Sequence, residues 1–371
     1  MRAAVARGEA ARLPIGISLT RTVAVLGGSG LALAMLVVVA VTVGSHEVSL
    51  GDTAAILGRR LLALPIAETW APSNEKIIFD IRLPRVLTAM LVGGGLAVAG
   101  TVFQALLRNP LADPYVIGTA AGASFGAALG IAAPLVLPAL AIGAGSSLLG
   151  LGVVQVLAFV GGIGTVLLVY AVARGGGRVQ MVTLLLTGYA VSAVLAALVA
   201  LLMFVSGRAL GAIFGWLMGS LANAGWVPPA FATPLMLISF IGLLARWRRL
   251  NLLLLGDAQA ASLGVHVERE KLRLTILATL ATSAAVAISG TIGFVGLVVP
   301  HLLRLAIGPD HRLLLPASML VGAGLLVLAD LIARLVPGGG IPVGVVTALI
   351  GAPFFLWLLR RSRLLRAELS A

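Results

Sequence analysis

The sequence MVTLLLTGYAVSAVLAALVALLMF, residues 181–204, is an apolar run without a single charged side chain. About 20 consecutive apolar residues are enough to cross the hydrocarbon core of a bilayer as an α-helix. A second run, LALAMLVVVAVTV, occupies residues 31–43. Because lipid offers no water to backbone N–H and C=O groups, such segments satisfy them internally by forming helices. The stretch therefore predicts a membrane helix, and similar runs should be found along the chain.

The composition of the whole chain supports this interpretation. Of the 371 residues, 60% are hydrophobic and 11% are charged, whereas a soluble domain carries about 25% charged residues. The 46 glycines permit close helix packing in a membrane, and the alternating segments typical of a β-barrel are absent from the sequence. We expect an all-α polytopic membrane protein with about ten transmembrane helices, near residues 22–44, 86–106, 115–136, 148–172, 181–205, 228–246, 272–289, 293–308, 313–335 and 342–359.

Basic residues are concentrated on one side of these spans. By position, about 19 of the 26 Lys and Arg residues precede the first span, follow the last, or flank connections on the same side. Cytoplasmic loops carry this excess, so we expect both termini in the cytoplasm. The net charge of +13 is thereby explained without nucleic acid. The first apolar run is longer than a signal-peptide core and lacks a clear small-residue cleavage site after it, so we interpret it as a retained helix.

Several kinds of chemistry are missing from the sequence. There is no cysteine, which excludes disulfides and thiolate metal sites. The two lysines, Lys76 and Lys271, do not stand in a phosphate-binding GxxxxGK[ST] loop, so the chain cannot act as a P-loop ATPase by itself. The four histidines show no metal-ligand spacing, and no Ser/His/Asp set is discernible. We therefore expect a protein without catalytic residues or a resident metal.

An ion-coupled secondary transporter is an alternative class. Such carriers keep acidic side chains inside their spans, where they are costly and functional. The clearest candidate is Asp330 in LADLIARL (328–335), and Arg334 lies four residues later, where the two charges can meet on one helix face. A paired charge near the membrane surface is the simpler interpretation. The scarcity of other such acids weighs against an ion-driven carrier.

The connections between the spans carry more specific information. In FQALLRNPLADPYVIG (103–118), Pro110 and Pro114 restrict their neighbours and end helices, which predicts a stiff turn that projects its side chains. In RGGGRVQMV (174–182), three glycines predict a mobile entry to the fifth span.

A third connection, NLLLLGDAQAASLGVHVERE (251–270), lies between two basic membrane flanks. We expect Asp257 to cap a short helix through Ala260 and Leu263, and Gly264 to end it. Such a helix suits a groove on another protein; an interfacial amphipathic helix is the alternative interpretation.

Several of these segments together resemble one family. IRLPRVLTAMLVGGGLAVAGTVFQALLRNPLADP (81–114), GDAQAASLGV (256–265), SGTIGFVGLVVPHLLRL (289–305), GPDHRLLLP (308–316) and PVGVVTALIGAPFFLWLL (342–359) are similar to the FecCD-type permeases. These permeases are the membrane subunits of type II ABC importers for haem, ferric siderophores and vitamin B12. The resemblance extends from about residue 80 to the C-terminus.

The resemblance implies a homodimer of ten-helix subunits in a bacterial inner membrane. It also implies two cytoplasmic ABC ATPase subunits, one periplasmic substrate-binding protein, and ATP acting only through the partner subunits, with no cofactor bound permanently. Residues 1–371 would form a single transmembrane permease domain surrounded by lipid. From the distribution of charges we expect residues 1–21 to be a cytoplasmic segment and 45–80 a periplasmic loop. The resemblance implies that residues 251–270 are the cytoplasmic coupling-helix region.

The resemblance further assigns three groups of site residues. The cytoplasmic gate would comprise Asn109, Pro110, Leu111, Gln180, Met181 and Val182. Coupling to the ATPase would use Leu255, Gly256, Asp257, Ala260, Leu263 and Gly264. Docking of the binding protein would use Arg82, Arg85 and Arg334. One departure from the family is Gly340, which stands before Ile-Pro-Val-Gly where relatives commonly have Glu.

For the transported cargo, RNPLADP and GPDHRLLLP look most like the haem-importing members of the family. We therefore expect haem, with a ferric siderophore or cobalamin as alternatives. Tyr115 and Tyr189 are the two tyrosines that could face the pathway, although packing roles explain them as well.

Overall fold

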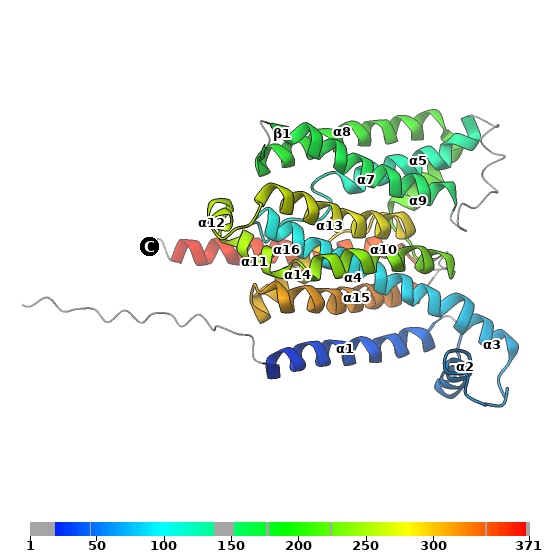
Figure 1. The fold of residues 1–371 in the computed structure, drawn as a ribbon. Coiled ribbons are helices and arrows are strands. Elements are labelled where there is room, and N and C mark those ends of the chain that lie inside the picture. The colour runs from blue at the N-terminus through cyan, green and yellow to red at the C-terminus, as the bar shows by residue number, and fades with distance from the viewer. Residues whose placement is uncertain are drawn as a thin grey trace, which may run out of the picture.

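The computed structural model describes residues 19–44, 46–136, 152–175, 178–222, 225–337 and 340–368. Long helices dominate this part of the chain, together with one antiparallel pair of two-residue strands (Figure 1). In chain order the elements are α1 (Leu19–Thr42), α2 (Leu50–Leu62), α3 (Pro72–Lys76), the π-helix η1 (Ile77–Arg82), α4 (Leu83–Leu106), α5 (Thr119–Val136), α7 (Val153–Ala173), β1 (Arg174–Gly175), β2 (Arg178–Val179), α8 (Met181–Val205), the 3₁₀-helix η2 (Gly207–Ala209), α9 (Leu210–Leu217), α10 (Val227–Leu244), α11 (Trp247–Leu254), α12 (Asp257–Ser262), α13 (Val267–Ser289), α14 (Val295–Ile307), α15 (His311–Leu335) and α16 (Val343–Glu368).

Each of the ten expected spans coincides with an apolar helix, namely α1, α4, α5, α7, α8, α10, α13, α14, α15 and α16. Among the described residues, seven helices are long and apolar enough to cross a membrane, while the apolar parts of α5, α14 and α16 are shorter. At 1.5 Å per residue, a helix of 13 residues such as α14 is about 20 Å long, short of the roughly 30 Å hydrocarbon core. The all-helical membrane architecture is confirmed, and the number of crossings stays a prediction.

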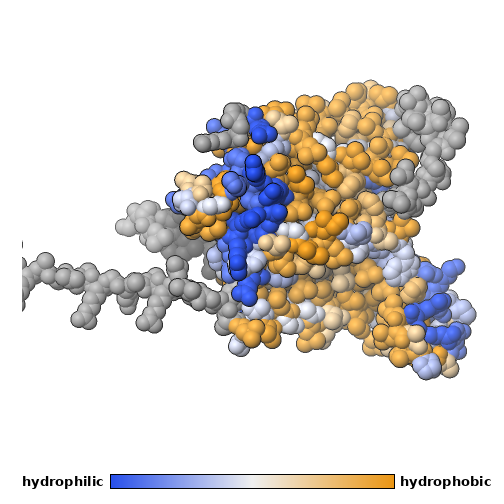
Figure 2. All heavy atoms as spheres, viewed as in Figure 1, coloured by the Kyte–Doolittle hydropathy of each residue, from blue (hydrophilic) through white to orange (hydrophobic). Residues whose placement is uncertain are grey.

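The two ends of the bundle differ from its middle. Figure 1 shows the beginning of α1 and the end of α16 at the same end, which is also the end that carries α11 and α12. In Figure 2 a hydrophilic band crosses the bundle near this end, a second hydrophilic patch covers part of the opposite end, and apolar atoms fill the surface between them. This pattern is what a bilayer requires of a spanning protein. The cytoplasmic position of the first end remains a prediction.

The helix α4 forms the centre of the bundle. It packs against α10, α13, α14 and α15, and most of its side chains are buried. Glycines allow this packing, because a Cβ added at Gly100 would lie 1.8 Å from the Gly296 carbonyl oxygen and one added at Gly93 would lie 2.2 Å from the Gly322 oxygen. Backbones that approach so closely exclude any larger residue. By contrast, few residues of α1 and α8 are fully buried in this single chain.

The segment 45–80, expected to be a simple loop, contains regular structure in its described part. It includes α2, α3 and the start of η1. Ser49 caps α2 by accepting a hydrogen bond from the Asp52 N–H at 3.0 Å, and Arg59 and Arg60 lie in its last turn, where they complement the helix dipole. The sequence analysis did not predict α2, because this helix is short and amphipathic rather than continuously apolar.

Candidate functional site

The connection between α4 and α5, residues 107–118, contains the predicted gate residues Asn109, Pro110 and Leu111 and is called the gate turn here. The backbone N–H of Asn109 donates to the Gln104 carbonyl at 3.1 Å, and the Asn109 side-chain oxygen accepts from the Leu111 N–H at 3.0 Å. Asn109 and Pro110 are exposed and Leu111 is half-buried. Arg108 adopts a φ of +46°, which is uncommon for a residue with a side chain. The turn is thus held in one shape by local hydrogen bonds, and its tip is exposed in this chain.

Polar side chains of α4 and α14 support the gate turn from behind. The Gln104 side chain donates to the Leu297 carbonyl at 3.1 Å and accepts from the Arg304 guanidinium at 2.9 Å. Gln104 and Arg304 were not predicted as site residues, because nothing in the sequence signals that positions 200 apart meet.

Asp113, in the same turn, provides a pH-dependent prediction. Desolvation raises the pKa of Asp113 to about 6, and the hydrogen bond that its carboxylate accepts from the Tyr115 N–H at 2.8 Å acts in the opposite direction. A carboxyl with a raised pKa stabilises the fold fully below its unfolded pKa, near 4, and loses this contribution as pH rises through about 6. We therefore expect the Tm of Asp113→Asn to rise relative to wild type between pH 4.5 and 7.5, because an amide carries no charge to desolvate. Parallel Tm curves for the two proteins would contradict the assignment.

The second predicted gate element, residues 180–182, directly follows Val179, the last residue of β2. Val179 is buried, Gln180 occupies the N-cap position of α8 without a side-chain capping bond, and Val182 is exposed. The residues between the two strands, 176 and 177, lie outside the described part of the chain. The expected mobility of this glycine-rich entry therefore stays a prediction.

The helix α12 projects from the end of the bundle beside α11 (Figure 1). Ala260 faces inward and is fully buried, whereas Leu255 and Leu263, on either side of the helix, are 57% and 58% exposed. Gly256 and Gly264 adopt φ values of +111° and +83°, which allow the chain to turn sharply at both ends. The prediction that Gly264 ends this helix is confirmed. Leu255 and Leu263 are thus accessible to another protein at this end of the bundle.

The prediction that Asp257 caps α12 was wrong. The N-cap position belongs to Gly256, and Asp257 is the first helical residue. Its carboxylate instead accepts from the Arg108 guanidinium at 3.0 Å and from the Lys271 ammonium at 2.5 Å. Because Asp257 lies one position past the N-cap, its carboxylate is free to pair with these two cations through charge-assisted hydrogen bonds. Arg108 lies 149 positions away, and the sequence gives no signal for this contact.

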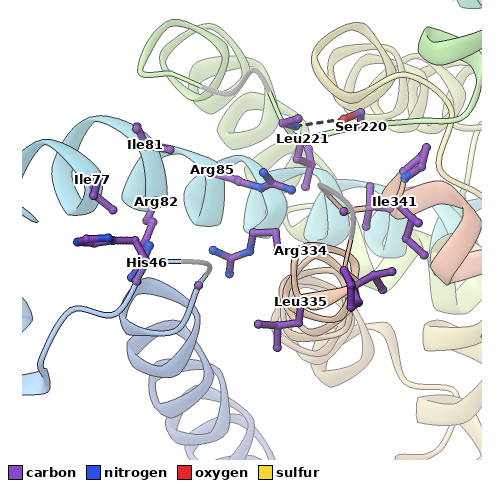
Figure 3. Close-up of a pocket in the computed structure, with 17 residues that line it drawn as sticks. His46, Ile77, Ile81, Arg82, Arg85, Ser220, Leu221, Arg334, Leu335 and Ile341 are labelled. Atoms are coloured by element: carbon purple, nitrogen blue, oxygen red, sulfur yellow. Dashed lines mark hydrogen bonds between the residues drawn. The ribbon is translucent and has the colours of Figure 1, made fainter.

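At the opposite end of the bundle, the three predicted docking arginines line one cavity of about 680 Å³, called the arginine pocket here (Figure 3). Arg82 is only 5% exposed. Its guanidinium donates to the carbonyl of Val41 at 3.1 Å and also to those of Thr42 and His46. Arg82 therefore fastens the end of α1 to the start of α4.

Arg85 and Arg334 share the buried carboxylate of Asp330, which is 1% exposed. Arg85 donates to both oxygens of Asp330, with bonds of 2.8–3.1 Å, and Arg334 approaches it at 3.2 Å while donating to the Ala40 carbonyl at 2.9 Å. The predicted Asp330–Arg334 pair is confirmed, and the second arginine was not foreseen. With three guanidiniums and one carboxylate, the arginine pocket carries a net positive charge. The charge of Asp330 is already balanced by two arginines, so this carboxylate is poorly suited to binding a coupling ion.

Gly340, the departure from the family pattern, also lines the arginine pocket. It adopts a φ of +84°, and a Cβ there would lie 3.0 Å from the Ala333 carbonyl oxygen. Glutamate rarely adopts this conformation, so glycine fits the local backbone better.

The two tyrosines behave differently. The Tyr115 hydroxyl donates to the Ile292 carbonyl at 3.0 Å, and its ring packs against the core, which is a structural role. Tyr189 on α8 is 75% exposed on this chain.

Among the described residues, no group of three or more His, Cys, Asp or Glu side chains could hold a metal ion.

Comparisons with known proteins agree with this geometry. The FecCD transport family matches residues 32–361. The hemin transport system permease protein HmuU of Yersinia pestis is 44% identical over 81% of this chain and 90% of its own length. The cobalamin import system permease protein BtuC of Halobacterium salinarum is 43% identical over 80% of this chain and 77% of its own length.

A solved structure, of an inward-facing ABC transporter assigned to the metal-chelate type, superposes with a TM-score of 0.77 at 35% identity. The match covers 91% of this chain and 99% of that one. A family match over most of the length, two close relatives and the shared arrangement of helices all indicate the same assignment. The chain belongs to the FecCD transport family, and it is a multi-pass membrane permease of the ABC importer class.

Proposed function

We propose that this chain is the permease subunit of an ATP-driven importer that moves haem from a periplasmic binding protein to the cytoplasm by alternating access. The observation that carries the importer assignment is the projecting helix α12, with Leu255 and Leu263 exposed beside it, in a chain of the FecCD transport family. Two copies of the chain would enclose the pathway, and two ATPase subunits would bind α12 of each copy. ATP would bias the permease between two states through contacts that differ between those states.

In this proposal the gate turn and residues 180–182 close the cytoplasmic end of the pathway at the dimer axis. The hydrogen bonds around Asn109 favour such a role, because a gate must hold one shape in each state. The chain has Gln180, Met181 and Val182 where relatives often carry small hydroxyl residues, so this gate closes with larger side chains.

The docking role of Arg82, Arg85 and Arg334 is part of the same proposal. The arginine pocket lies at the end opposite α12, and its positive wall suits acidic side chains of a binding protein. All three arginines also stabilise the fold, through backbone carbonyls and Asp330. Charge reversal at Arg82 or Arg85 is therefore expected to affect folding as well as docking, and binding must be measured on correctly folded protein.

The proposal of haem as cargo is supported by the 44% identity to the hemin transport permease and by the segments RNPLADP and GPDHRLLLP. A relative named for cobalamin is about equally similar, so cobalamin and ferric siderophores are the alternative cargoes. An ion-coupled carrier is disfavoured, because Asp330 is neutralised by two arginines.

Growth of an iron-starved strain that lacks this chain tests the cargo. We expect loss of growth with haem as the only iron source, restored by the wild-type chain, and normal growth with a ferric siderophore. Cobalamin-dependent growth serves as the control for the third cargo. Intact use of haem together with a siderophore or cobalamin defect would reject haem and keep the importer.

A further inference from the structure

The carboxylate of Asp257 connects three separate parts of the chain. It lies at the start of α12, one oxygen accepts from Arg108 in the gate turn at 3.0 Å, and the other accepts from Lys271 in α13 at 2.5 Å. The Arg108 guanidinium also lies against Gly256, because a Cβ added there would be 3.5 Å from it. Asp257 thus uses both oxygens inside its own chain, while the exposed leucines beside α12 remain available to a partner.

The connection continues from Lys271 to the second gate element. The Lys271 side chain is only 4% exposed, and its ammonium lies 3.9 Å from one oxygen of Glu268. The other oxygen of Glu268 accepts from the backbone N–H of Val179 at 3.0 Å. Val179 directly precedes Gln180, at the start of α8. An alternating series of charges, Arg108, Asp257, Lys271 and Glu268, therefore joins the gate turn, α12, α13 and the second gate element.

The strengths of these contacts suggest what they do. Arg108 and Asp257 are both roughly half-exposed, and exposed ion pairs contribute little to stability. Their geometry is nevertheless demanding, because an ion pair needs its charged atoms within about 4 Å of each other. A movement of α12 by a few ångströms must therefore carry the gate turn with it or break the pair. Either way, the position of α12 and the conformation of the gate become energetically dependent on each other.

We propose that Arg108, Asp257, Lys271 and Glu268 are positioning residues that link α12 to both elements of the gate within one subunit. The inference rests on the proposed function, which assigns residues 107–118 and 180–182 to the gate and α12 to the ATPase contact. It changes the role of Asp257, which acts on its own chain, whereas Leu255 and Leu263 face the partner. Because α12 is joined to both gate elements, both change conformation together when the ATPases move it.

A spin label on the gate tests the link directly. The chain has no cysteine, so Leu111→Cys introduces a single labelling site in each subunit. The distance between the two labels is measured by double electron–electron resonance in the complex with cysteine-free ATPases, without nucleotide and with ATP plus vanadate. This readout needs no transported cargo. Coupling is measured in parallel as haem taken up per ATP hydrolysed in proteoliposomes.

Two variants that remove a charge, Arg108→Gln and Asp257→Asn, are made singly and together on the Leu111→Cys background, with Glu268→Gln as a third. We expect each single variant to reduce the ATP-driven change in label distance at least threefold. The double variant should lose no more than the worse of the two singles, because both break the Arg108–Asp257 ion pair and only Asp257→Asn also removes the charge that faces Lys271. Arg269→Gln is the matched control, since Arg269 is an exposed arginine of α13 outside the series, and it should change the distance as wild type does.

The outcomes distinguish the proposed link between α12 and the gate from the gate and α12 assignments on which it rests. A normal distance change in Arg108→Gln and Glu268→Gln, with uptake per ATP unchanged, would overturn the link and leave the gate and α12 assignments intact. Losses that add up in the double variant would also overturn it, since they would show two independent effects. A wild-type complex that shows no ATP-driven change at residue 111 would overturn the gate assignment and the link together.

Discussion

Replacing Leu263 by glutamate is expected to lower ATP-driven uptake more than tenfold. Leu263 is 58% exposed at the projecting end of α12, where a groove on the ATPase would cover it. Burying a leucine is worth about 1.5–3 kcal/mol, and a carboxylate in the same groove would be desolvated without a partner. The change occurs in both subunits, so its effect on assembly is doubled. Transport is measured as uptake into proteoliposomes, and assembly is measured by co-purification of the ATPase subunits.

Two further variants make this result interpretable. Leu263→Met conserves the volume and apolar character of the side chain, and we expect it to assemble and transport nearly as wild type does. Leu255→Glu places a charge on the other exposed leucine and should reproduce the defect of Leu263→Glu. If Leu263→Glu assembles and transports normally at wild-type expression, α12 is not the ATPase contact.

Replacing Asp330 by alanine is expected to destabilise the folded subunit by about 3–5 kcal/mol, the usual cost of removing one partner of a buried charge cluster. Asp330 is 1% exposed and balances Arg85 and Arg334, whose side chains are 18% and 10% exposed. Without the carboxylate, two guanidiniums remain in a poorly hydrated environment. Thermal unfolding of the purified protein should show a Tm lowered by several degrees.

Asp330→Asn is the matched control, because it keeps a hydrogen-bond acceptor and removes only the charge. We expect its Tm to fall between those of wild type and Asp330→Ala. Replacing Arg85 and Arg334 by methionine in the Asp330→Ala background should recover part of the lost stability, since apolar groups of similar size often replace a buried ion cluster without loss. A Tm of Asp330→Ala equal to that of wild type would show that solvent reaches the two arginines freely.

These predictions concern opposite ends of one bundle, and the structure explains how they differ. The arginine pocket is built from charges that hold α1, α4 and α15 together, so substitutions there affect the fold first. Around α12, the exposed leucines contribute little to the fold of the subunit alone. Substitutions there should affect assembly and transport while the subunit remains folded.

Much of the fold was predictable from the sequence. All ten apolar segments became helices, and Gly264 ended α12 as expected. The physical reason is that the transfer of a segment into lipid depends on the summed apolarity of some 20 consecutive residues, and a glycine stop depends on a few neighbours. The amphipathic helix α2 was overlooked because its apolar residues alternate with polar ones over a short length.

The partners of the charged residues were decided only by the tertiary structure. The sequence alone determined that this chain is a helical membrane protein, and its motifs identified the family. It could not determine that Asp257 pairs with Arg108 rather than capping its own helix, that Arg85 joins Asp330 from 245 positions away, or that carbonyls at the end of α1 hold Arg82. Lipid partitioning is local and additive along the chain, whereas an ion pair requires two side chains within about 4 Å. Only the packing of the helices fixes that distance.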